Sequence, residues 1–301
     1  MNQNSKKHIS VLASETIKKL NLKKEGIYVD ATLGMGGHSK MIAPNVNKLI
    51  VFDQDINAIN QAKLNLSEFT NITFVHDNFS NMKARIEEMG ISKVDGILFD
   101  LGTSFYQLTD PDRGFTYHGE TTLDMRMNQS QELDAKIVLN EYSEEDLANI
   151  FWWYGEEKKS RTLAAKIVEA RKLKHFETNK DLNKVIDTLK SFNKDKHRYK
   201  NIYQAIRIEV NHEFESLEKS LTESLCLIGI NGVIAVITFH SLEDKLVKQV
   251  FYKAKQEKLE TLFETKHKYS TKKTVYPKSE EIEANPAARS SKLRTLIKNY
   301  E

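Results

Sequence analysis

Short apolar runs alternate with amphipathic stretches through the first hundred residues. Four runs rich in β-branched residues are typical of strands buried on both faces: Ile27–Val29, Leu49–Phe52, Ile72–Val75 and Val94–Phe99. Two stretches between them, Ile56–Leu66 and Phe79–Met89, space their apolar residues as an amphipathic helix does. The resulting β-α-β-α-β order predicts an α/β fold with a parallel sheet and right-handed crossovers.

A long insertion interrupts this pattern. The next buried run, Val233–Phe239, comes about 130 residues after the fourth, and the residues between them have mainly helical periodicity. We therefore expect a discontinuous α/β domain formed by residues 1–107 and 214–301, with a separate helical domain over 108–213. Apolar positions from Ile202 to Ile228 recur at three- and four-residue steps and predict one long helix leading back to the sheet.

Composition restricts the class of protein. The chain is 40% hydrophobic and contains 2 Trp, 11 Tyr and 14 Phe, which is enough apolar material for folded domains and argues against disorder. No apolar stretch approaches the ~20 residues that cross a bilayer, and the first residues lack a signal-peptide run. We expect a cytoplasmic protein without a membrane partner. Cys226 is the only cysteine, so an internal disulfide is excluded, and its apolar neighbours predict a core position.

The net charge of +3 hides an uneven distribution. Residues 109–157 carry a net charge of −9, residues 158–207 carry +10, and residues 241–301 carry +5. Basic clusters of this size either bind a polyanion such as RNA or form solvated helix faces. Lys outnumbers Arg by 36 to 9, so each Arg is the more informative candidate for gripping a phosphate.

A glycine-rich loop follows the first strand, in the sequence Gly34-Met35-Gly36-Gly37-His38. Such a loop lets the backbone approach a ligand closely. Asp53 ends the second strand 17 residues after Gly36, where a carboxylate can accept both hydroxyls of a ribose. An adenosine-containing ligand is implied. Ser39 stands where a dinucleotide fingerprint would have its third glycine, and both NAD and S-adenosylmethionine fit these features.

The ends of the third and fourth strands carry further polar and aromatic residues. Asp77-Asn78-Phe79 offers polar groups for an adenine edge and a ring for stacking. The segment from Asp100 to Gln107 places a carboxylate, hydroxyls, an amide and two aromatic rings beyond the strand end. Open α/β sheets bind ligands at this position, and in amino-group methyltransferases it holds the target amine.

Seven segments resemble, in order, those of the bacterial 16S ribosomal RNA cytosine-N4 methyltransferases, the RsmH or MraW family. They are Gly34–Ser39, Asp100–Ser104, Arg113–Phe115, Leu123–Met127, Gln204–Asn211, Phe239–Asp244 and Asn285–Arg294. The resemblance implies a Rossmann-like S-adenosylmethionine-dependent methyltransferase sheet with an inserted helical substrate-recognition domain. It also implies methyl transfer to the 4-amino group of a decoding-centre cytidine of 16S rRNA, position 1402 in the usual numbering. The small ribosomal subunit would then be the partner of a monomer or homodimer.

Carried over position by position, the family's cofactor contacts fall on seven residues: Gly36, Gly37, His38, Asp53, Phe79, Asp100 and Gln107. No metal ion is needed, because the sulfonium is already a good leaving group. Two segments depart from the family pattern. The loop Thr103–Gln107 lacks the usual proline, and the run from His197 to Tyr203 lacks the usual residues before Gln204.

For catalysis we expect Asp100 and Ser104 to line the reaction site and Phe105 or Tyr106 to stack on a flipped cytosine. His240 either hydrogen-bonds the base or accepts a proton there, or it merely packs against Glu243 or Asp244.

The candidate substrate contacts include four further residues. Arg113 and Arg126 are expected on RNA phosphates. Arg207 and Asn211 share a helix face and are expected at the pocket, unless Arg207 pairs with a carboxylate. Two other functions remain open: an NAD-dependent oxidoreductase, and a non-catalytic RNA-binding or ribosome-assembly factor gated by S-adenosylmethionine.

Overall fold

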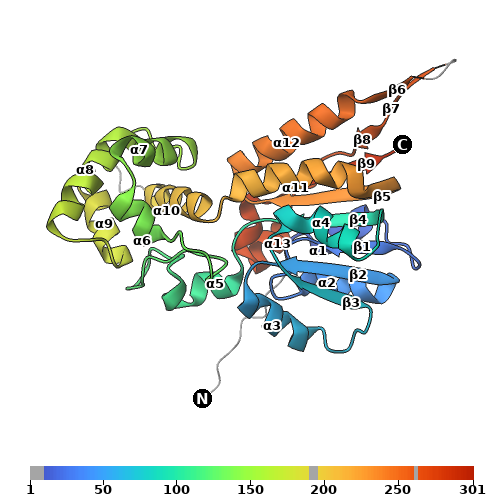
Figure 1. The fold of residues 1–301 in the computed structure, drawn as a ribbon, viewed down its shortest axis with the longest axis horizontal. Helices are drawn as coiled ribbons and strands as arrows, with labels where there is room; N and C mark the ends of the chain where they lie inside the picture. Colours follow the sequence, from blue (N-terminus) through green and yellow to red (C-terminus); the bar gives the residue numbers. More distant parts are fainter. Residues whose placement is uncertain (1–9, 190–195, 261–263) are drawn as a thin grey trace. The chain divides into compact units, whose positions relative to one another are not determined.

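The computed structural model describes residues 10–189, 196–260 and 264–301. The chain forms two compact units (Figure 1). We call Met1–Gly102 with Phe214–Glu301 the sheet unit, and Thr103–Glu213 the helical unit. The chain thus leaves the sheet unit directly after the fourth strand and returns to it near the start of a helix.

The sheet unit is built on one seven-stranded sheet with the order β3-β2-β1-β4-β5-β9-β8. Its strands are β1 (Ile27–Asp30), β2 (Lys48–Asp53), β3 (Ile72–His76), β4 (Val94–Asp100), β5 (Ile228–Thr238), β8 (Tyr269–Thr271) and β9 (Lys292–Lys298). The first five strands in this order are parallel, and β9 is antiparallel to both β5 and β8. The strand order reverses between β1 and β4. The predicted α/β class with a mainly parallel sheet is confirmed.

Helices cover both faces of this sheet (Figure 1), and neighbouring strand residues pack into opposite cores. Tyr28 and Leu49 contribute to the core under α1 (Ala13–Leu20), α2 (Gly37–Ile42) and α3 (Ile56–Asn65). Val29 and Ile50 contribute to the core under α4 (Met82–Glu88), α11 (Glu213–Leu227) and α12 (Ser241–Gln256). Burial on both faces explains why these strands are apolar runs rather than alternating patterns.

Several short elements complete the sheet unit. They are η1 (Ala43–Asn45), η2 (Phe79–Asn81), the β6 (Lys258–Glu260) and β7 (Thr265–His267) ribbon, α13 (Ser279–Ala284) and η4 (Pro286–Ser290). Within the described ranges, no helix is both long and apolar enough to cross a bilayer.

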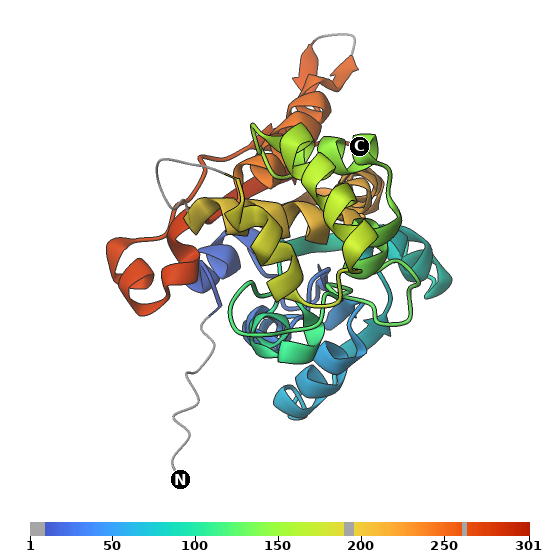
Figure 2. The same ribbon diagram turned by 90° about the vertical axis from the view of Figure 1, so that its left-hand side faces the viewer.

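The helical unit has its own apolar core. Its elements are α5 (Phe105–Thr109), η3 (Pro111–Arg113), α6 (Ala135–Glu141), α7 (Glu144–Trp153), α8 (Ser160–Leu173), α9 (Asn179–Asp187) and α10 (Lys196–Val210). Helices α6 to α10 of this unit are green to yellow in Figure 2, and their shared core includes the buried side chains of Phe151, Leu163 and Ile206. Ser143 caps α7 by accepting a hydrogen bond from the backbone N–H of Asp146.

The prediction of one long helix from Ile202 to Ile228 is wrong. The helix ends at Val210 and a new one begins at Glu213, because His212 adopts a left-handed conformation with a φ of 46°. Val210 packs in the core of the helical unit, whereas Leu217 packs in a core of the sheet unit. Apolar positions on both sides of the break keep helical spacing, so periodicity alone does not reveal it.

The prediction that Cys226 is a core residue is also wrong. Its side chain is exposed on the last turn of α11. Leu225 and Leu227 on either side pack against the sheet, and successive helix residues lie about 100° apart, which turns Cys226 outward.

Candidate functional site

Carboxylates end three neighbouring strands of the sheet unit. Asp30 is the last residue of β1, Asp53 of β2 and Asp100 of β4. These strands are parallel, so their carboxyl ends lie along one edge of the sheet, at the point where the strand order reverses between β1 and β4. Open α/β sheets bind ligands at such a position. We call Asp30, Asp53 and Asp100 the strand-end carboxylates.

The glycine-rich loop lies between β1 and α2. Gly34 and Gly36 have φ values of 50° and 82°, a region that residues with a Cβ rarely adopt. A Cβ at Gly37 would lie 2.0 Å from Ser10 Oγ, whereas one at Gly34 would meet no atom within 4 Å. The loop therefore needs its glycines for its own path, and it leaves open space beside Gly34.

Asp53 holds this loop in place. Its Oδ2 accepts a hydrogen bond from the Gly34 N–H at 2.8 Å, and its Oδ1 accepts one from the Asp55 N–H at 2.9 Å. Burial raises the pKa of Asp53 to about 6, in spite of these two hydrogen bonds. An ionised carboxylate has about four acceptor sites, so two remain for a ligand with two adjacent hydroxyls.

His38 is buried and lies beside the partly exposed Asp100. His38 is 5% exposed, and its Nε2 lies 3.3 Å from Asp100 Oδ2. Burial lowers the pKa of His38, but the hydrogen bond to Asp100 and the charges of Asp100 and Asp30 outweigh it, so the pKa is raised overall. Asp100 Oδ1 is buried and has no hydrogen-bond partner among the described residues. A donor from a bound molecule would satisfy it.

Asp30 is a site residue that the sequence analysis missed. It is 1% exposed, its Oδ2 accepts a hydrogen bond from Ser39 Oγ at 2.7 Å, and burial raises its pKa. Ser39, at the position of the third glycine of the fingerprint, thus donates its hydroxyl to this buried carboxylate. The signal was present in the sequence, since Asp30, like Asp53 and Asp100, directly follows an apolar run.

Phe79 begins η2 after β3, and it is partly buried. Its ring meets that of Phe99 edge-on, with centroids 5.7 Å apart and planes at 88°. Asn78 Nδ2 donates to Gln54 Oε1 at 2.8 Å, while Asp77 accepts a hydrogen bond from Arg85 Nε at 2.7 Å. The side chains of Asp77 and Asn78 thus already have partners in other parts of the sheet unit, and Phe79 remains the apolar candidate for contact with an adenine.

His240 caps a helix. Its Nδ1 accepts from the N–H of Glu243 in the first turn of α12, and Glu243 Oε2 accepts from the His240 N–H in return. Its Nε2 lies 2.9 Å from Glu243 Oε1, and the side chain is 12% exposed. These contacts match the second of the two interpretations of His240, packing against Glu243.

In the helical unit, Ser104 and Gln107 cap α5. Ser104 Oγ accepts from the Gln107 N–H at 3.2 Å, and the Ser104 N–H donates to Gln107 Oε1 at 3.0 Å. The Gln107 side chain is 4% exposed, so this carbonyl is committed to the cap. Tyr106 on the same helix is 43% exposed. The side chain of Phe105 lies outside what the structure describes.

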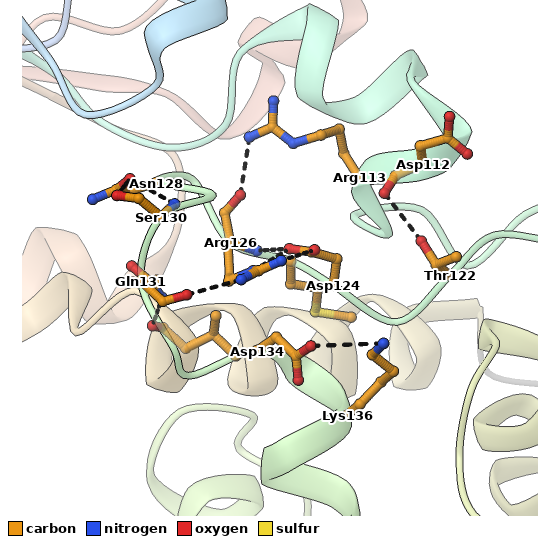
Figure 3. A network of polar contacts seen from close by, with 12 residues as sticks. Asp112, Arg113, Thr122, Asp124, Arg126, Asn128, Ser130, Gln131, Asp134 and Lys136 are labelled. Atoms are coloured by element: carbon orange, nitrogen blue, oxygen red, sulfur yellow. Dashed lines mark hydrogen bonds and ion pairs between the residues drawn. The ribbon is translucent and has the colours of Figure 1, made fainter.

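The prediction that Arg113 contacts RNA phosphates is wrong. The residue is 1% exposed, and its Nη2 donates to the Arg126 carbonyl at 2.9 Å (Figure 3) and to the Met127 carbonyl at 3.1 Å. The guanidinium has no surface to offer a phosphate, because it ties together the loop that precedes α6.

Arg126 is committed to neighbours in the same loop (Figure 3). Asp124 accepts from its Nε at 3.0 Å and from its Nη2 at 2.7 Å, and the Gln131 carbonyl accepts from its Nη1 at 2.8 Å. A phosphate would therefore compete with Asp124, and contact of Arg126 with RNA stays a prediction.

Arg207 and Asn211 are also internal. Arg207 forms a two-point pair with Glu213, at 2.7 and 2.9 Å, which is the carboxylate pairing left open for it. Asn211 is 4% exposed; its Oδ1 accepts from the Met127 N–H, and its Nδ2 donates to the Met125 carbonyl. The prediction that Asn211 binds substrate is wrong, because its amide joins α10 to the loop around Met127.

Known proteins resemble this chain over nearly its full length. The ribosomal RNA small subunit methyltransferase H of Clostridium botulinum (strain Loch Maree / Type A3) is 45% identical over 305 residues, covering 97% of this chain and 99% of the relative. That of Streptococcus mutans serotype c is 43% identical over 312 residues, covering 97% of each. A solved structure of a putative methyltransferase from Streptococcus mutans in complex with SAH is more distant, at 14% identity and a TM-score of 0.41, over 97% of this chain and 99% of that one.

The family assignment rests on sequence. The sequence pattern of the MraW methylase family matches residues 5–299, which include both halves of the sheet unit and the whole helical unit. This chain belongs to the MraW methylase family.

Proposed function

We propose that this protein transfers a methyl group from S-adenosylmethionine to the exocyclic 4-amino group of a cytidine in the decoding centre of 16S rRNA, position 1402 in the usual numbering. The observation that carries the proposal is the row of strand-end carboxylates beside a glycine-rich loop, in a member of a methylase family. The curated relatives are named as methyltransferases of small-subunit ribosomal RNA, which supports RNA of that subunit as the substrate.

The residues of the sheet unit suit S-adenosylmethionine. Asp53 keeps two acceptor sites for the ribose hydroxyls, and the backbone beside Gly34 leaves open space. Phe79 offers a ring for the adenine. When bound, S-adenosylmethionine supplies an electrophilic methyl group on a positively charged sulfonium, which is a good leaving group. The negative charges of Asp53 and Asp100 complement that cation.

Asp100 is the residue that we assign to the reaction itself. The 4-amino nitrogen of cytosine donates its lone pair into the ring and is a poor nucleophile. A carboxylate that accepts an N–H of this amine turns the lone pair toward the methyl group and stabilises the positive charge that develops on the nitrogen. The unsatisfied Oδ1 of Asp100 is suited to this, while His38 holds Oδ2.

Base recognition is assigned to the helical unit. A cytosine within an RNA must leave its stack before its amine is accessible, and an aromatic side chain can replace the lost stacking. Tyr106 is 43% exposed on α5, next to Phe105 and close in sequence to Gly102, where the chain leaves the sheet unit. We assign Tyr106 this stacking role. Ser104 positions α5 through its capping hydrogen bond.

The test is methyl transfer from labelled S-adenosylmethionine to small ribosomal subunits purified from a strain that lacks the modification. The wild-type protein should label the 16S rRNA, and Asp100→Asn should lower kcat by about 100-fold or more, as expected when an electrostatic interaction made in the transition state is removed. Binding of both ligands without transfer by the wild type would instead favour the non-catalytic RNA-binding factor.

A further inference from the structure

A second concave site lies on the sheet unit, and none of the strand-end carboxylates lines it. Its volume is about 440 Å³, and it is formed by one side of α12 together with β8, β9 and Lys272. Its lining residues are Lys245, Lys248, Gln249, Phe251, Tyr252, Lys255, Thr271, Lys272, Arg294 and Thr295. We call it the α12 pocket.

The α12 pocket is strongly basic. Five of its ten lining residues are Lys or Arg, and none is Asp or Glu. Arg294 and Lys248 are partly neutralised by Asp244, whose carboxylate lies 2.5 and 3.6 Å from their nitrogens. No carboxylate within the described ranges pairs with Lys245 or Lys272, and both side chains are exposed. The pocket therefore presents uncompensated positive charge to whatever enters it.

The basic side chains of the lining suit phosphate groups. Lysine and arginine side chains donate charge-assisted hydrogen bonds to phosphate oxygens, and five of them line this one pocket.

The pocket also has an aromatic wall. Tyr252 is 66% exposed on α12, and Phe251 next to it is 4% exposed. A ring left open to solvent beside phosphate-binding cations is the arrangement by which proteins hold single-stranded nucleic acid, with the base on the ring and the phosphates on the cations.

We propose that the α12 pocket binds an unpaired nucleotide of the RNA substrate, outside the cytidine that is methylated, with its base against Tyr252 and its phosphates on Lys245, Lys248 and Lys272. This rests on the proposed function, because the RNA is the substrate named there. A longer polyanion is favoured over a small phosphorylated ligand, since residues 241–301 carry a net charge of +5, more than one phosphate requires.

The test compares two variants with a matched control. One variant combines Lys245→Gln, Lys248→Gln and Lys272→Gln, and the other is Tyr252→Ala. The control is Lys253→Gln, an exposed lysine on α12 that does not line the pocket. Binding to 16S rRNA is measured by filter retention at several salt concentrations, and methyl transfer to small subunits gives kcat and KM.

We expect the triple variant to bind RNA about tenfold or more weakly and to lower the slope of log affinity against log salt by about 2, at ~0.7 for each phosphate that is no longer neutralised. Tyr252→Ala should weaken binding about fivefold or more without changing that slope, and Tyr252→Phe should restore it. Both variants should raise KM for the subunit at unchanged kcat. Lys253→Gln should match the wild type.

Equal affinities and salt slopes in the variants and in Lys253→Gln would overturn the proposal. So would variants that bind intact subunits weakly but naked rRNA normally, because the partner would then be a ribosomal protein. If the wild type transfers no methyl group at all, the proposed function fails, while filter binding still decides the role of the pocket.

Discussion

The raised pKa of Asp53 predicts that binding of S-adenosylmethionine depends on pH. Burial raises its pKa to about 6, and its role requires the ionised form, which accepts hydroxyl protons. Protonation below that pH removes acceptor sites. We therefore expect the Kd for S-adenosylmethionine to rise as the pH falls from 7 to 5, approaching about tenfold per pH unit below the pKa. Isothermal titration calorimetry across this range measures it.

Asp53→Asn is the control for that titration, because an amide has no proton to gain in this range. Its Kd should be higher than that of the wild type at pH 7 and should change less between pH 7 and 5. A wild-type Kd that is constant over the same range would show that the Asp53 carboxylate does not contact the ligand.

Arg113 is expected to contribute to the stability of the fold and not to RNA binding. Its Nη2 serves the carbonyls of Arg126 and Met127 from a buried position. Arg113→Met leaves both acceptors without this donor, so the free energy of unfolding should fall by about 1–3 kcal/mol in a urea titration. The salt dependence of RNA binding should not change at temperatures where the variant is folded.

Arg161→Gln is the matched comparison, since Arg161 is exposed on α8. It should unfold at the wild-type urea concentration. If Arg113→Met were instead as stable as the wild type and bound RNA with a shallower salt slope, Arg113 would be a phosphate contact after all.

At the scale of elements, the break between α10 and α11 depends on one residue. His212 is exposed and holds a φ of 46°, which costs about 1–2 kcal/mol for a residue with a Cβ. His212→Gly should raise the free energy of unfolding by about 0.5–1 kcal/mol, because glycine adopts this conformation freely but gains entropy in the unfolded chain. His212→Val should lower it by about 1 kcal/mol or more. A lower stability of the glycine variant would mean that the side chain, not the backbone, holds this turn.

Variants of His240, at the start of α12, distinguish a capping role from a catalytic role. Asparagine is a good N-cap residue and alanine is a poor one, so His240→Ala should lower the free energy of unfolding by about 1 kcal/mol while His240→Asn stays near the wild type. We expect kcat of methyl transfer to be unchanged in His240→Asn. A stable asparagine variant with a large loss of kcat would return His240 to the reaction site.

Elements were predicted well wherever burial alone determines the pattern. The strands of the parallel sheet are apolar on both faces, so Leu49–Phe52 and Val94–Phe99 stood out in the sequence. The break at His212 did not, because Val210 and Leu217 keep helical spacing while packing in different cores. The spacing of apolar residues indicates which face of a helix is buried, but not which core that face packs against.

At the scale of the molecule, the sequence predicted the class of fold and the edge of the sheet at which the strand-end carboxylates lie. It failed for internal polar residues. Arg113 was predicted to bind RNA because Arg is scarce in this chain, and Asn211 because it shares a helix face with Arg207. In the structure, the side chains of both residues hydrogen-bond backbone groups of the loop that includes Met125, Arg126 and Met127. The hydrogen-bond partners of such residues come together only when the chain folds. The sequence therefore predicted more RNA contacts in the helical unit than the structure allows.

The proposed reaction modifies one atom of one nucleotide, so mapping the methylated position is its sharpest test. Small subunits from a strain lacking the modification are incubated with the protein and labelled S-adenosylmethionine, and the 16S rRNA is digested and analysed by mass spectrometry. We expect one new methyl group, on N4 of cytidine 1402, and about 100-fold slower transfer with Asp100→Asn. A methyl group on another atom or nucleotide, or full activity of Asp100→Asn, would contradict it.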